Sequence, residues 1–306
     1  MSGMSTAWEM GRDTVSAWVE DEAPSQGAAL AFYTLFSIAP LLLIVISLAG
    51  LLFGEDAARG QIMGQLSGLV GADSAQMIQT MLEGLNQPRA GLYGTIVGFV
   101  TLLVGATTVF AQLQTALDHI WESPAPATGG GVWQFIKTRI LSIGMILGIG
   151  FILMVSLIMS AALAALGKWW APWFEEMAFI GYLIDGVVSF VLLTAIFAMI
   201  YKWLPRVRVA WRDVLLGAAL TAILFVVGKL LISFYIGRSG VASGFGAAAS
   251  LVVLLLWVYY SAQIFLLGAE FTWVFSHRFG SLKNKKSPTV VPTGKTKPGN
   301  LATAKP

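Results

Sequence analysis

Six long apolar stretches constrain this sequence most, because each can cross the hydrocarbon core of a bilayer. A transmembrane helix needs about 20 predominantly apolar residues. The stretches occupy residues 28–53, 92–116, 138–166, 178–203, 211–236 and 245–275. They lack the alternating polarity of outer-membrane barrel strands, and only helices and closed barrels span bilayers. The sequence therefore predicts an all-α, polytopic membrane protein with six transmembrane helices.

The composition supports a place in the membrane. Apolar residues make up 57% of the 306 residues and charged residues only 11%, against about 25% charged residues in an ordinary soluble domain. The chain has no cysteine and only two histidines. This excludes disulfides, thiolate metal sites and thiol nucleophiles, and it disfavours an imidazole-based metal site. We therefore expect no metal and no other cofactor.

The distribution of lysine and arginine predicts the orientation of these helices. If the N-terminus lies in the cytoplasm, the cytoplasmic segments hold 14 of the 19 basic residues and the outer segments hold 4. Cytoplasmic loops of membrane proteins are enriched in lysine and arginine. We therefore expect a multi-pass membrane protein with both termini in the cytoplasm.

The chain divides into three parts. Residues 1–27 are expected to form a cytoplasmic segment. Within it, the pattern of residues 5–20 predicts an amphipathic helix, with Trp8, Val15, Trp18 and Val19 roughly on one face. Such a helix lies in the plane of the membrane interface; the alternative is a frayed polar leader. Residues 28–278 form the six-helix transmembrane domain, and residues 279–306 predict a disordered, basic cytoplasmic tail.

The outer loop at 54–91 predicts two short amphipathic helices. Its apolar residues recur at helical spacing, first as Met63, Leu66 and Val70 and then as Met77, Met81 and Leu85. The two helices either cap a pocket in the bundle or form a plain packed connection.

Two charges in consecutive spans are expected at matching depth. Asp185 and Lys229 each lie 7 residues from the outer end of their spans, or about 10 Å below that face. Charges inside a membrane are costly and mark functional sites, so a binding or coupling site for a charged solute is one interpretation. The alternatives are a structural ion pair or a lysine that extends toward the interface.

A third charge, Glu270, lies near the inner end of the last span. Gln263 precedes it by seven residues and shares its helix face, and Tyr260 lies three residues earlier. These residues predict a polar stripe that faces the bundle interior. Asp118, His119 and Arg139 are expected at the same cytoplasmic level, where they predict a charge cluster. Interhelical hydrogen bonds of this kind are often only structural, at about 0.6 kcal/mol each.

The first span contains a proline. Pro40 cannot donate a hydrogen bond to the Phe36 carbonyl, so a kink with a free carbonyl is expected. Tyr33 and Ser37 precede it on the same face and complete a small polar pocket near the bilayer centre. Kinked helices line transport sites in many transporters, but they also occur in inert bundles where a neighbour satisfies the carbonyl.

Several short motifs resemble those of one bacterial family. The first span reads ALAFYTLFSIAPL at 29–41, and the loop after the fourth span reads YKWLP, with Arg206 and Arg208, and then WRD. The fifth span contains GK at 228–229 and FY at 234–235. The sixth span contains LLWVY at 255–259 and GAE at 268–270. Together these motifs are similar to the YihY/BrkB family of bacterial inner-membrane proteins, over roughly residues 10–278.

The resemblance implies six helices and sets a broad functional context. The family has carried the name ribonuclease BN, which is generally regarded as a misassignment. Some members are associated with virulence or with export of envelope lipids. No residue with a proven catalytic role transfers from the family to this sequence.

We expect a transporter or exporter of an amphiphilic or anionic envelope-related solute. Lys229 would attract the anion, Asp185 would be its resting partner, and Glu270 would respond to protons. The glycine-rich turn at 237–246 would add flexibility. The alternative is a membrane scaffold or assembly protein for envelope integrity, in which the charges only fix helix packing.

An enzyme is not expected, because the sequence has no metalloprotease, P-loop or serine-hydrolase motif. A membrane-bound ribonuclease is disfavoured, since no basic, aromatic surface for nucleic acid is evident. The expected partners are the lipid bilayer and an amphiphilic or anionic small molecule, and not nucleic acid. An oligomer or a protein partner stays open.

Overall fold

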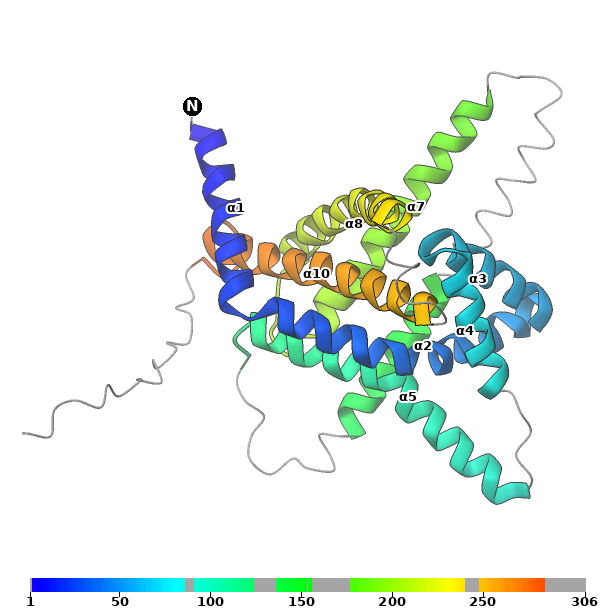
Figure 1. Ribbon diagram of the computed structural model, residues 1–306. Helices are drawn as coiled ribbons and strands as arrows, with labels where there is room; N and C mark the ends of the chain where they lie inside the picture. Colours follow the sequence, from blue (N-terminus) through cyan, green and yellow to red (C-terminus); the bar gives the residue numbers. More distant parts are fainter. Residues whose placement is uncertain are drawn as a thin grey trace, which may run out of the picture.

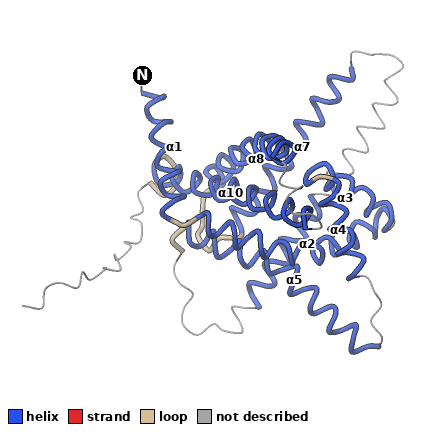
Figure 2. The backbone as a smooth tube through the Cα atoms, in the orientation of Figure 1, coloured by secondary structure: helices blue, strands red, loops and turns tan. Residues whose placement is uncertain are grey.

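The computed structural model describes residues 2–85, 91–123, 136–152, 154–155, 177–239 and 248–283. Over these ranges it is all-α and contains no strand, which confirms the all-α part of the predicted fold class (Figures 1 and 2). The labelled helices are α1 (Ser2–Glu20), α2 (Ala23–Phe53), α3 (Glu55–Val70), α4 (Ala72–Leu85), α5 (Gly91–Ile120), α7 (Met177–Trp203), α8 (Trp211–Ser239) and α10 (Ala249–Arg278). Residues 136–152 are also helical.

Within the described residues, five helical segments are long and apolar enough to cross a membrane. They are Ala23–Leu51, Val100–Ile120, Gly186–Trp203, Trp211–Ile232 and Ala249–Arg278. They correspond to the first, second, fourth, fifth and sixth predicted spans. The third predicted span, 138–166, is helical at 138–152, while residues 153 and 156–166 lie outside the described residues. A total of six spans therefore stays a prediction.

Helix α2 runs through Pro40 and packs closely against α5. A Cβ atom at Gly105 of α5 would lie 3.1 Å from Cγ of Pro40 and 3.9 Å from the carbonyl oxygen of Phe36. The neighbouring helix therefore presents a residue without a side chain to the position where proline interrupts the hydrogen-bond pattern of α2. Helix α2 thus packs closely on α5, and it also lies against α10 (Figure 1).

Helices α7, α8 and α10 meet at two glycines. A Cβ atom at Gly217 of α8 would lie 1.8 Å from Oγ1 of Thr272, and one at Gly268 of α10 would lie 1.9 Å from Oγ1 of Thr221. Small residues let helix backbones approach closely inside membranes. The buried Tyr201 hydroxyl donates to the Phe265 carbonyl at 2.7 Å and so joins α7 to α10.

The pair α3–α4 confirms the two helices predicted for the 54–91 loop. The buried side chains of Ile78 and Leu82 join Ile46 of α2 and Leu254 of α10 in a second apolar cluster. Ser74 of α4 also donates to the Ser250 carbonyl at 3.5 Å, at the start of α10. The pair therefore packs on the end of the bundle where α2 ends and α10 begins (Figure 1).

Helix α1 lies at the opposite end, against the last turns of α10 (Figure 1). Its end is marked by Glu22, whose backbone has a left-handed φ of 52°. The structure shows a helix over the predicted residues 5–20, whereas its amphipathic, interfacial character stays a prediction. Trp8, with 78% of its surface exposed, points away from the bundle together with Val15 and Val19, whereas Trp18 packs on the core. Placement of this face in the membrane interface stays a prediction.

Candidate functional site: an acidic cavity between α1 and α10

A cavity of about 470 Å³ lies where α1, the end of α5 and the end of α10 meet. Its lining is rich in carboxyl groups, which make up five of its eleven residues. The lining residues are Asp13, Ser16, Ala17, Glu20, Asp21, Glu122, Glu270, Trp273, Val274, His277 and Arg278. The apolar bundle therefore ends in a pocket of strongly acidic character.

Helical periodicity explains why these residues face one another. On α10 the lining residues begin at Glu270 and recur at spacings of three, four, seven and eight residues, so they form one helix face. On α1 and the following turn, the lining residues repeat the same spacing from Asp13 to Asp21. Glu122 completes the wall just after α5 ends at Ile120. Two polar helix faces therefore enclose the cavity.

Glu270 is the most deeply buried of these acids. Only 1% of its surface is exposed, and its Oε1 atom has no hydrogen-bond partner among the described residues. Its carboxyl group lies close enough to that of Asp21 to act on the pKa of Asp21. A hydrogen bond between two carboxyl groups needs a proton, because two ionised carboxylates have no donor to offer. The pair is therefore suited to hold and release a proton.

Asp21 lies outside the spans, in the turn between α1 and α2. Burial raises the pKa of its carboxyl group, and the neighbouring Glu20 adds to this effect. The His119 side chain and the hydrogen bond from Glu270 oppose it. Burial disfavours the charged form and a like charge does the same. Asp21 therefore takes up a proton at a higher pH than an ordinary aspartate.

Arg278 closes one side of the cavity. Its guanidinium group forms ion pairs with Glu9 at 3.0 Å and with Asp13 at 3.2 Å, so it ties the end of α10 to α1. These side chains are partly exposed, and such pairs contribute about 0.2–1 kcal/mol each. On the same face of α10, the rings of Trp273 and His277 lie 4.5 Å apart between centroids.

The predicted stripe on α10 divides between two neighbouring helices. Gln263 lies against α2, where its side-chain amide donates to the Pro24 carbonyl at 3.5 Å. A Cβ atom at Gly27 would lie 2.0 Å from that amide nitrogen. Tyr260 lies against α8 instead, where a Cβ atom at Gly228 would be 3.1 Å from its ring. Gln263 and Glu270 therefore share the face toward the start of α2.

The predicted polar pocket around the proline is only partly enclosed. Ser37 is buried, and its hydroxyl has no partner among the described residues. Tyr33 is 37% exposed and its ring packs edge-on against Phe32. Pro40 is buried against Gly105. Ser37 therefore faces the interior, while the aromatic ring of Tyr33 is turned toward the outside of the bundle.

The predicted pair of Asp185 and Lys229 stays a prediction. Lys229 is half-buried on α8 and makes no hydrogen bond or ion pair with the part of the chain that the structure describes. Asp185 belongs to the backbone of α7, but its side chain lies outside the described residues.

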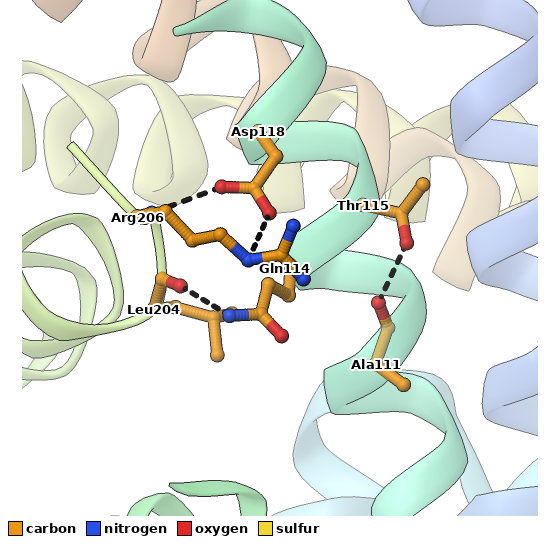
Figure 3. A network of polar contacts seen from close by, with 6 residues as sticks. All are labelled: Ala111, Gln114, Thr115, Asp118, Leu204 and Arg206. Carbon is orange, nitrogen blue, oxygen red and sulfur yellow. Dashed lines mark hydrogen bonds and ion pairs between the residues drawn. The ribbon is translucent and has the colours of Figure 1, made fainter. Parts of the chain in front are cut away.

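The members of the predicted charge cluster have separate contacts. Asp118 accepts a hydrogen bond from the Arg206 backbone at 2.9 Å and pairs with the guanidinium Nε of Arg206 at 3.3 Å (Figure 3). Gln114 donates to the Leu204 carbonyl at 3.1 Å. Together these contacts fasten the loop after α7 to α5. Arg139 donates to the Thr107 hydroxyl in the middle of α5, and His119 acts on Asp21.

Sequence reasoning missed most of the carboxyl groups in the cavity. Asp13, Glu20, Asp21 and Glu122 lie outside the apolar stretches, where acidic residues are usually solvated. One feature of the sequence could have indicated them: polar residues recur on one face of α1, opposite its apolar face.

Asp213 is a second missed residue. It is buried at the start of α8 and accepts hydrogen bonds from the Ser281 backbone at 2.8 Å and the Ser281 hydroxyl at 2.7 Å. It thereby anchors the chain directly after α10, and its place in the WRD motif was the available signal.

These features define an all-helical, multi-pass membrane protein with an acidic cavity at one end. The chain belongs to the family described as virulence factor BrkB, whose sequence profile matches residues 14–291. This confirms the family suggested by the motifs.

The relatives are named only as membrane proteins. A UPF0761 membrane protein of Pseudomonas aeruginosa is 29% identical over 263 residues, which cover 85% of this chain and 61% of the relative. A UPF0761 membrane protein of Tolumonas auensis is 30% identical over 257 residues, covering 82% and 80% of the two chains. This chain thus spans about three fifths of the Pseudomonas relative. No solved structure matches it.

Proposed function

We propose that this protein is a proton-coupled transporter that exports an amphiphilic, envelope-related solute across the bacterial cytoplasmic membrane. The observation that carries the proposal is the buried Glu270, which lies in an apolar helix long enough to span a bilayer and opens onto a cavity. Ionisable residues in membrane spans are costly and mark ion pathways and proton relays.

The surroundings of Glu270 suit a proton site. The charged and titratable groups around the cavity are Asp13 and Glu20 on α1, Asp21 in the turn, His119 and Glu122 at the end of α5, and His277 and Arg278 on α10. The carboxyl groups outnumber the cationic groups. Protonation of Asp21 is therefore favoured, because it relieves repulsion between like charges.

Polar groups continue from this cavity into the bundle. The amide oxygen of Gln263 and the hydroxyl of Ser37 are buried without a partner among the described residues. Buried polar groups without protein partners are usually met by ordered water or by a ligand. This supports a hydrated path along the contact between α2 and α10, which starts at the Asp21–Glu270 pair.

The orientation follows from the distribution of basic residues. If both termini lie in the cytoplasm, α1 and the acidic cavity face the cytoplasm and α3–α4 face outward. A cavity on the cytoplasmic side is where an exporter collects its solute. The acidic lining disfavours the anionic solute that Lys229 suggests, and it also disfavours RNA, whose phosphates it would repel.

A non-transporting scaffold is the second candidate. It is favoured by the polar contacts that only join elements, such as Asp118 with Arg206 and Asp213 with Ser281. In a scaffold, the Asp21–Glu270 pair would only fix the position of α1. The two candidates differ in whether the interior between α2 and α10 is wet.

Cysteine accessibility separates the two candidates, because the chain has no cysteine of its own. Single cysteines at Ser37, Gln263 and Lys229 would be treated with a membrane-impermeant thiol reagent from each side, in protein shown to be folded. A cysteine at the lipid-facing Leu230 is the matched negative control, and one at the exposed loop residue Arg208 is the positive control.

A transporter requires Ser37 and Gln263 to react, to an extent that changes with pH as Asp21 and Glu270 titrate. Reactivity at Lys229 would extend the wet path to the other side of the bundle. If Ser37 and Gln263 are as protected as Leu230 while Arg208 reacts, the interior is dry and the scaffold replaces the transporter.

A further inference from the structure

We propose that the acidic cavity binds an alkylammonium group, as carried by a small polyamine or by an amine-bearing lipid headgroup. The proposal names the substrate class of the transporter and rests on the function proposed above. It depends on four features of the cavity: its charge, an unused acceptor, its aromatic wall and its shape.

The charge of the cavity is not neutralised by its own residues. Arg278 is already paired with Glu9 and Asp13. The other four acids, Glu20, Asp21, Glu122 and Glu270, form no ion pair within the part of the chain that the structure describes. A cation that enters the cavity would therefore meet carboxyl groups without cationic partners, whereas an anion would be repelled.

The unused acceptor is Oε1 of Glu270. It lies in a residue with 1% exposure, lines the cavity and has no hydrogen-bond partner among the described residues. A buried acceptor left unpaired costs about 1–3 kcal/mol. An ammonium group offers three donors and no acceptor. Its hydrogen-bonding pattern therefore matches a lining that is rich in acceptors.

The aromatic wall suits an alkyl chain with a positive end. Trp273 lines the cavity one turn after Glu270, and its ring packs against that of His277. Indole is the best aromatic partner for a cation, and its apolar face also accommodates methylene groups. Carboxyl groups beside an indole therefore favour an organic cation over a strongly hydrated inorganic ion.

The shape of the site excludes compact coordination. The described residues contain no group of three His, Asp or Glu side chains that could hold a metal ion. The carboxyl groups are instead distributed around a cavity of about 470 Å³, within the usual range of about 300–1,000 Å³ for small-molecule sites. Distributed negative charge fits an elongated cation with one or more amines.

The test is titration of the full-length protein in phosphatidylcholine nanodiscs with spermidine, using isothermal titration calorimetry. Glu270→Gln and Asp21→Asn should each weaken binding by about tenfold or more, as expected when a carboxyl group that accepts hydrogen bonds from the ammonium is lost. The matched control is Glu83→Gln, which removes an exposed acid on α4 at the other end of the bundle. This control should bind spermidine as the wild type does.

Two further measurements keep the test decisive. Substitution of the buried acids also changes packing. The double variant Glu20→Gln/Glu122→Gln therefore alters two less buried acids of the same cavity, and it should also weaken spermidine binding. Magnesium chloride at matched ionic strength should not displace spermidine more than sodium chloride does. Equal binding by all variants, no binding by the wild type, or full displacement by magnesium would overturn the proposal.

The source of the amine is decided by the lipid. If spermidine binding is lost in phosphatidylethanolamine nanodiscs, the headgroup occupies the same site and the ligand is a lipid. If binding is unchanged, the ligand is a free amine. Spermidine binding that depends on Glu270, together with protected cysteines at Ser37 and Gln263, would reject transport but retain the site. Reactive cysteines without amine binding would retain transport and reject this substrate class.

Discussion

The carboxyl group of Glu270, inside an apolar helix, lines the same cavity as that of Asp21 in the turn that joins α1 to α2 and acts on its pKa. This interaction connects a buried position of the bundle to a segment outside the spans. A change in the protonation of Asp21 therefore changes the charge of the cavity between α1 and α10.

The titration of Asp21 predicts a pH-dependent stability. Because burial raises its pKa in the folded protein, the folded state binds its proton more tightly than the unfolded state. The stability from this group is complete below the ordinary carboxyl pKa of about 3.9 and is lost as the pH rises through the higher folded value. Asp21→Asn should therefore remove part of the fall in melting temperature that accompanies a rise in pH above about 4.

The measurement is thermal unfolding of the purified protein at a series of pH values. Asp56→Asn on α3 is a suitable control, because Asp56 is exposed at the other end of the bundle. The pH profile of that control should run parallel to the wild-type profile. An Asp21→Asn profile that also runs parallel would show that Asp21 does not titrate in this range.

The contact between Gly217 and Thr272 predicts a sharp response to one methyl group. A Cβ atom at Gly217 would lie 1.8 Å from Oγ1 and 2.8 Å from Cβ of Thr272, so rotation of the threonine cannot relieve the overlap. Gly217→Ala should destabilise the protein by about 1–3 kcal/mol, as overpacking does. Gly186→Ala on α7, where a Cβ atom meets no atom of the described residues within 4 Å, should be close to neutral. Similar melting temperatures for the two variants would refute the close packing of α8 on α10.

The contrast between these two glycines shows how far the sequence could predict the fold. Apolar length predicted the helices, because a span depends only on its own residues. It could not distinguish Gly217 from Gly186, because the difference lies in the neighbouring helix. Gly105 shows the same limit: the sequence drew attention to Pro40 in the first span, but not to the glycine of α5 that packs against it.

The candidate site was predicted in part for the same reason. Glu270 stood out because a charge inside an apolar stretch is unusual, and the structure places it in the cavity. Asp21 and Glu20 did not stand out, because acids in a polar leader are usually solvated. Only the packing of α1 on α10 turns them into partners of Glu270.

Arg278 predicts how α1 is held. Its ion pairs with Glu9 and Asp13 join α1 to the end of α10, and Arg278→Ala removes both at a cost of about 1 kcal/mol, because the pairs are partly exposed. Global stability should then change little, while amide hydrogen exchange over residues 6–20 should become faster. Arg59→Ala, which breaks an exposed ion pair within α3, should leave exchange in α1 unchanged. Slow exchange in the Arg278 variant would show that apolar packing alone holds α1.

The exposed apolar face of α1 predicts contact with lipid. Trp8, Val15 and Val19 point away from the bundle, whereas Glu20 lines the cavity, so the two sides of the helix face different surroundings. An environment-sensitive fluorophore on a cysteine at Val15 should become brighter and blue-shifted when the detergent-purified protein is moved into nanodiscs, and lipid-borne quenchers should dim it. The same label at Glu20 should respond weakly to both. Because an interfacial helix buries its apolar side about 5–10 Å into the headgroup region, quenching should be strongest with quenchers near the headgroups. Equal responses at Val15 and Glu20 would show that α1 does not contact lipid, and that the side of the cavity formed by α1 lies away from the membrane.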